Sequence, residues 1–101
     1  MSHSIYQNQT QYRSWEVFVQ DRNRNLSRPT VNSGTYNLIG PSGEQIVPTT
    51  QVVVTSPNIV SFLIRPSSGS ATIGEFSEIW VVYIGSEDFT REETLYVREN
   101  F

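Results

Sequence analysis

The side chains best suited to chemistry in this sequence are acids and amides, and one group of them imitates a calcium-binding loop. Asp21, Asn23 and Asn25 alternate along the chain, as the first ligands of such a loop do. The sixth loop position is Leu26 where the bend requires glycine, and the twelfth is Asn32 where the ion requires a bidentate glutamate. We therefore interpret this segment as a turn and expect no metal site.

Two acidic pairs could instead supply the two carboxylates of a glycosidase. Glu75 with Glu78 and Glu87 with Asp88 are the closest candidates in the sequence. In a strand, successive side chains point to opposite faces, so Glu75 and Glu78 are predicted to face opposite ways. We interpret all four as solvated acids at turns and strand edges.

The residue types that the sequence lacks narrow the possible chemistry. Among 101 residues there is no cysteine and a single histidine, His3. Cysteine nucleophiles, thiolate metal sites and histidine-based triads are therefore excluded, and we expect a protein that is not an enzyme and has no cofactor. The net charge of −3 and the absence of a long apolar run also argue against nucleic acid and membranes as partners.

Alternating apolar residues and regularly spaced turn signals predict an all-β protein. We expect strands at 15–20, 35–39, 44–47, 51–55, 59–65, 76–84 and 89–97, a loop over 21–33 with a short edge strand at 30–31, and a strand end at Pro48. About seven short strands with turns between them indicate a β-sandwich. The chain is long enough for one such domain.

The first thirteen residues show no strand or helix period, and we predict that residues 1–13 form an extended arm before a sandwich domain at 14–101. Ile5, Tyr6 and Tyr12 would anchor this arm on a neighbouring protein. The alternative is a frayed terminus without a partner.

Four of the seven basic residues lie early in the chain, and all seven are arginines. The four are Arg13, Arg22, Arg24 and Arg28. We expect them to bond carboxylates of a neighbouring subunit, in a segment that contains Glu87, Asp88, Glu92 and Glu93. Solvated loop charges are the alternative interpretation.

The aromatic residues allow two interpretations. Core packing is the preferred one for Trp15, Phe62, Trp80 and Tyr83, over a stacking platform for sugars or bases. We expect Tyr6, Tyr12 and Tyr36 to be exposed and to serve a protein interface, because tyrosine combines apolar area with a hydroxyl group.

The order of strands and turns resembles a known family. The relevant segments are 36–44 (YNLIGPSGE), 59–64 (IVSFLI), 74–76 (GEF) and 79–82 (IWVV). Together they are similar to the immunoglobulin-like domains of tailed-bacteriophage virion proteins, such as capsid-surface proteins and the upper baseplate protein family. The resemblance implies an immunoglobulin-like β-sandwich with no catalytic residues.

The resemblance also implies a role. We expect a structural protein of a virion assembled in the host cytoplasm, foremost a cement or decoration protein that self-associates, binds the major capsid protein and stabilises the head. One alternative is a ring component of the neck, tail or baseplate, which binds other virion proteins. Another is a carbohydrate-binding module with exposed aromatic rings.

Overall fold

The structure is a computed structural model that describes residues 3–20, 22–66 and 73–99. The regular secondary structure in these residues consists of β-strands joined by turns and loops. The strands are β1 (His3–Tyr6), β2 (Gln11–Glu16), β3 (Val19–Gln20), β4 (Leu26–Ser27), β5 (Ser33–Ile39), β6 (Gln45–Gln51), β7 (Val53–Thr55), β8 (Ile59–Ile64), β9 (Gly74–Ile84) and β10 (Glu87–Arg98). The predicted all-β class is confirmed. The described ranges contain no helical segment that could span a membrane.

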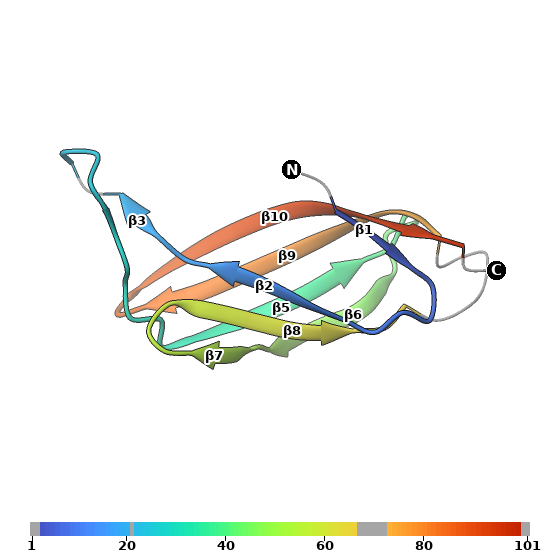
Figure 1. Ribbon diagram of the computed structural model, residues 1–101, viewed down its shortest axis with the longest axis horizontal. Coiled ribbons are helices and arrows are strands. Elements are labelled where there is room, and N and C mark those ends of the chain that lie inside the picture. Colours follow the sequence, from blue (N-terminus) through green and yellow to red (C-terminus); the bar gives the residue numbers. More distant parts are fainter. Residues whose placement is uncertain (1–2, 21, 67–72, 100–101) are drawn as a thin grey trace.

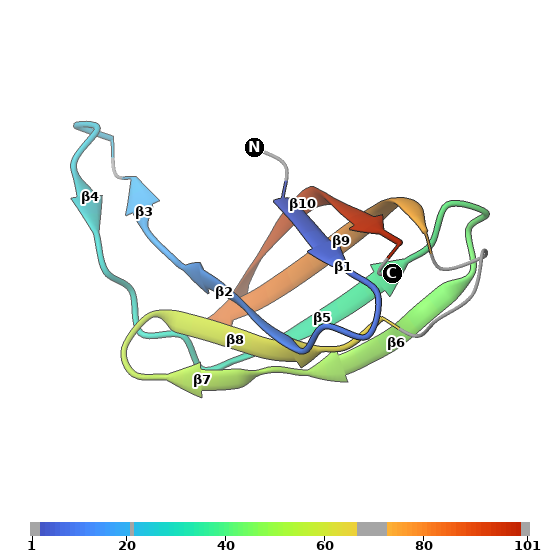
Figure 2. The ribbon, with the colours of Figure 1, turned by 45° about the vertical axis from the view of Figure 1, so that its right-hand side comes forward.

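Two sheets pack face to face and form a sandwich (Figure 1). The larger sheet has the strand order β1-β10-β9-β5-β6, and the smaller has the order β2-β8-β7. A third pairing, β3 with β4, forms a hairpin that extends away from both sheets (Figure 2). The molecule is therefore elongated, with extents of 48 × 23 × 21 Å.

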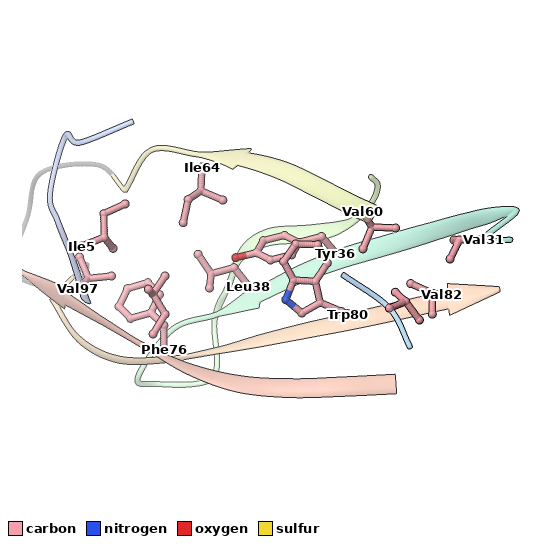
Figure 3. Close-up of a cluster of buried hydrophobic side chains, with 12 residues drawn as sticks. Ile5, Val31, Tyr36, Leu38, Val60, Ile64, Phe76, Trp80, Val82 and Val97 are labelled. Carbon is pink, nitrogen blue, oxygen red and sulfur yellow. The ribbon is translucent and has the colours of Figure 1, made fainter. Parts of the chain in front are cut away.

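The core lies between the sheets and is built mainly from alternate residues of β5, β8, β9 and β10, as the period of two predicts (Figure 3). The buried apolar side chains are Ile5, Val17, Val31, Tyr36, Leu38, Val60, Ile64, Phe76, Trp80, Val82, Leu95 and Val97. Tyr36 stacks on Phe62 and meets the edge of Trp80, both at 4.7 Å between ring centroids. The core position predicted for Trp80 is confirmed. The prediction of an exposed Tyr36 was wrong, since Tyr36 is wholly buried, and the core position predicted for Tyr83 was wrong, since Tyr83 follows the outward parity of β9 and is 40% exposed.

The N-terminal segment is part of the sandwich, so the predicted arm over 1–13 was wrong for the residues described. β1 pairs in parallel with the last four residues of β10, and Ile5 is buried between the sheets. The predicted boundary between Arg13 and Ser14 falls inside β2. Four residues with one apolar side chain facing inward are too few to show a period in the sequence, and the pairing partner lies at the other end of the chain.

The strand predicted at 15–20 is divided, and the loop predicted at 21–33 contains the hairpin strand β4. The pairing of β2 with β8 ends at Glu16, and Val17 bonds to Asn58, the residue before β8. The Val17 amide donates to the Asn58 carbonyl oxygen at 2.8 Å, and the Asn58 side chain donates to the Val17 carbonyl oxygen at 2.7 Å. The edge strand predicted at 30–31 is absent, and Val31 is instead a buried core residue.

The hairpin predicted around residues 40–43 is confirmed as β5, a tight turn and β6. Gly43 has a φ of 85°, a conformation that glycine adopts without steric cost. The predicted strand end at Pro48 was wrong, since β6 continues through it to Gln51. This is allowed because β6 is the last strand of its sheet and Pro48 need not donate on the outer side.

Candidate partner-binding surfaces

The structure separates the seven residues predicted to bind a partner into buried and exposed groups. Ile5 and Arg13 are buried and cannot contact another protein in this fold. The exposed ones are Tyr6, Tyr12, Arg22, Arg24 and Arg28, which come from three different parts of the surface. Only the last three, in and beside the β3–β4 hairpin, lie together.

Arg13 belongs to a charged cluster that connects the two sheets. From β2, its Nε donates to Glu78 Oε2 at 2.8 Å and its Nη2 donates to Glu78 Oε1 at 2.6 Å, a bidentate ion pair. The Tyr36 hydroxyl, from β5, donates to the same Glu78 Oε2 at 2.5 Å. Glu78, on β9, is 0% exposed, so its carboxylate depends on these three hydrogen bonds in place of water.

A second ion pair extends the cluster towards the edge of the larger sheet. Glu93 Oε2 lies 4.0 Å from Arg13 Nη2, and Arg91 Nη2 donates to Glu93 Oε1 at 2.5 Å. The Arg91 guanidinium lies 5.5 Å from the ring centre of Trp15, within range of a cation–π contact. Two arginines and two glutamates therefore balance one another, from the buried Glu78 out to Arg91, whose side chain is 36% exposed at the margin of the sandwich.

The electrostatics of the cluster follow from burial and pairing. The hydrogen bonds to Glu78 raise the pKa of Arg13, so the guanidinium stays charged. Burial, with the nearby Glu78 charge, raises the pKa of Tyr36 well above its usual range, so the hydroxyl stays protonated and donates. These protonation states fit a fixed structural link between the sheets.

The interpretation of Glu78 as a solvated acid was wrong, because Glu78 is buried. The prediction that Glu75 and Glu78 point to opposite faces is confirmed, since Glu75 is exposed. The alternation of residues along the strands already indicated that Glu78 and Arg13 face inwards. Glu78 lies two residues from both Phe76 and Trp80, and Arg13 lies two residues before Trp15, so each shares a face with a core aromatic residue. A charged residue on each inward face predicts a buried pair when the strands are known to pack together.

The outer face of the smaller sheet carries a strip of five uncharged residues, which we call the neutral face: Tyr12, Ser14, Val53, Ser61 and Leu63. Ser61 is half-buried and the other four are exposed, and the exposed Glu16 borders the strip on the same side of β2. Tyr12 lies directly opposite Leu63, and Ser61 lies between Ser14 and Val53, so all five side chains share one side of the sheet. Tyr12 is 69%, Val53 64% and Leu63 47% exposed. Three exposed apolar side chains on one side of this sheet make it a candidate surface for contact with another protein.

The β3–β4 hairpin is a second exposed surface. Besides Arg22, Arg24 and Arg28, it presents Phe18 and Leu26 to solvent. The calcium-like spacing falls on its tip, where Asp21 lies outside the described residues. Across the ranges that the structure describes, no three His, Cys, Asp or Glu side chains group as metal ligands.

The acidic segment predicted to face the arginines of a neighbour is divided by the fold. Glu87, Asp88 and Glu92 are exposed on β10, whereas Glu93 points into the sandwich towards Arg13.

In the comparisons with known proteins, no family model matches the chain and no curated protein is significantly similar to it. The surfaces themselves therefore carry the functional argument.

Proposed function

We propose that this protein is a non-enzymatic structural component of a tailed-phage virion, a cement or decoration protein that binds the outside of the head. The observation that supports this role is the neutral face, where Tyr12, Val53 and Leu63 are exposed on a regular sheet. The strand and turn order that resembles immunoglobulin-like virion domains supports the major capsid protein as the partner and the virion as the location.

The physical argument is one of adhesion. Covering a few hundred Å² of apolar surface at about 25 cal/mol per Å² contributes several kcal/mol. Association itself costs about 4 to 15 kcal/mol, so one such contact binds weakly. Many copies on one shell, linked to each other, bind more firmly because the contacts act together.

The interior also suits a part that must keep its shape. The Arg13–Glu78 ion pair joins β2 to β9, and Tyr36 adds a third strand to the same link. Sliding of one sheet across the other would leave a buried charge without a partner, which is costly. The neutral face is thus held in a fixed position relative to the larger sheet.

The test uses heads of the phage that encodes the chain, prepared without this protein, and the purified chain added back. Tyr12→Ser combined with Leu63→Ser should abolish binding to the heads, since both side chains point away from the core. Deleting residues 1–13 is not a useful variant, because it would remove β1 and half of β2. Circular dichroism and thermal unfolding show whether the double variant still folds.

A control is Tyr83→Ser combined with Tyr96→Ser, on the outer face of the larger sheet, where the two side chains are 40% and 38% exposed. It should bind heads as the unaltered chain does. Imaging of the particle then decides location: copies spread over the head support the proposal. A single ring at the neck, tail or baseplate would overturn it in favour of a ring component, and full binding by the Tyr12 and Leu63 variant would overturn the role of the neutral face.

A further inference from the structure

The β3–β4 hairpin has a firm base. Val17 and Val31, which bracket it, are both buried in the core. Backbone bonds from Val17 to Asn58 and from Val31 to Pro57, each 2.8 Å, fix the two sides of the base. The hairpin therefore leaves the sandwich in a defined direction.

Beyond this base the hairpin buries very little of its own surface. Its ladder consists of two residue pairs, Val19 with Ser27 and Gln20 with Leu26. Leu26 is 67% and Phe18 45% exposed. A two-stranded ribbon this short is marginally stable in water without a surface to pack on, so a protein partner would stabilise it.

A complementary surface lies at the outer edge of β10. β9 pairs with β10 along its whole length from Glu87, but on the other side β1 pairs only with the stretch that starts at Leu95. Among the described strands, none lies beside residues 87–92 on that side. These six residues present about 20 Å of strand edge, and such an edge accepts further strands.

The charges of the two surfaces are opposite. Residues 18–28 contain three arginines and one acid, and residues 87–92 contain three acids and one arginine. Both surfaces lie at the same end of the molecule, since the Asn32 side chain after the hairpin accepts a hydrogen bond from the Gly85 amide in the β9–β10 turn at 2.8 Å (Figure 1). Two copies facing each other can therefore exchange hairpins reciprocally.

We infer that this protein forms a twofold dimer in which the β3–β4 hairpin of each copy lies along residues 87–92 of the other. The arginines of the hairpin face Glu87, Asp88 and Glu92, while strand pairing and the burial of Phe18 and Leu26 supply the rest of the contact. Because each contact is repeated by the symmetry, the assembly closes at two copies and does not grow into a fibre.

The inference deepens the proposed function, since a dimer would present two neutral faces to a shell, but it rests on different residues. A chain that dimerises and does not bind heads would contradict only the proposed function. A monomer that binds heads would contradict only the dimer.

The test is sedimentation of the purified chain and of two charge-reversed variants. One variant carries Arg22→Glu and Arg28→Glu on the hairpin, and the other carries Asp88→Arg and Glu92→Arg on the edge. Each alone should be monomeric at concentrations where the unaltered chain is a dimer, because like charges then meet at both contacts. An equimolar mixture should form a heterodimer, because each hairpin again meets an edge of opposite charge.

Two controls complete the design. Arg65→Glu with Arg98→Glu reverses two exposed arginines away from the hairpin and should leave the dimer intact. High salt should weaken the dimer about tenfold or more by screening the charges. A monomeric unaltered chain at high protein concentration and low salt, or reversed variants that remain dimers, would overturn the inference, and so would a mixture that remains monomeric.

Discussion

Replacing Arg13 by methionine tests the buried cluster most directly. Methionine keeps much of the apolar stem of the side chain and removes the guanidinium, so the Glu78 carboxylate stays buried with one remaining donor, the Tyr36 hydroxyl. Among the described residues, no other cation lies within ion-pairing distance of Glu78. Both partners of the pair are at most 8% exposed, so water does not replace the lost bonds.

The expected cost follows from that geometry. Removing one partner of a buried ion pair typically costs about 3 to 5 kcal/mol, and the surviving Tyr36 bond places this case near the lower end, at about 3 kcal/mol. A domain of this size has about 5 to 15 kcal/mol of stability in total, so the variant should be strongly destabilised. With a urea dependence of about 1 to 3 kcal/mol per molar, the unfolding midpoint should fall by about 1 to 3 M.

The assay is urea unfolding followed by tryptophan fluorescence, because Trp80 packs against Tyr36 beside the cluster. Arg65→Met, at an exposed position, is the matched control and should change the free energy of unfolding by less than about 0.5 kcal/mol. A triple variant, Arg13→Met with Glu78→Leu and Tyr36→Phe, removes the unpaired buried carboxylate and the hydroxyl that bonds it, while Glu93 keeps its pair with Arg91, so this variant should be more stable than Arg13→Met alone.

Two results would refute this reasoning. The first is an Arg13→Met variant whose stability matches that of Arg65→Met, since the pair would then contribute no more than a solvated one. The second is a triple variant no more stable than the single one, since the cost would then come from lost packing and not from a buried charge. The triple variant keeps the test decisive even where Arg13→Met does not fold.

Three further predictions concern other parts of the fold. The pKa of Tyr36 is raised in the folded state, so its contribution to the free energy of unfolding is complete below the unfolded-state pKa of about 10. As the pH rises above 10, this contribution should fall by up to about 1.4 kcal/mol per pH unit, which unfolding measurements can follow. An equally steep loss of stability in Tyr36→Phe would contradict this assignment. Ile5→Ala should lower the free energy of unfolding in urea by about 2 to 4 kcal/mol, because Ile5 is buried in the sandwich, whereas Tyr6→Ala, at 51% exposure, should lower it by less than about 1 kcal/mol. Small and equal effects of the two substitutions would indicate that residues 1–13 form an arm and not part of the sandwich. Gly34→Ala should lower the stability measured in thermal unfolding by about 1 to 3 kcal/mol, because the Cβ of the alanine would lie 2.9 Å from the Val81 carbonyl oxygen. A loss of stability no larger than that of Ser33→Ala would show that β5 and β9 move apart there at little cost.

Much of the fold could be predicted from local patterns. β5, β8 and β9 were predicted within a few residues because each alternates apolar and polar side chains between clear turn signals. The candidate surfaces were predicted in part: the arginines at 22, 24 and 28 and the acids at 87, 88 and 92 are exposed as expected. Tyr12 was also predicted to be exposed, but as part of an arm and not of a sheet.

Local sequence was enough to predict the period of two along the strands and the positions of most turns, because both depend on neighbouring residues. The pairing of the strands and the contact between the sheets became known only from the folded structure, because they depend on residues far apart in the chain. Arg13 and Glu78 are separated by 65 positions, and each looks like an ordinary surface charge until the two sheets bring them to within 2.6 Å. The same long-range pairing made the N-terminal segment the edge strand β1 of the larger sheet and left the β3–β4 hairpin outside both sheets.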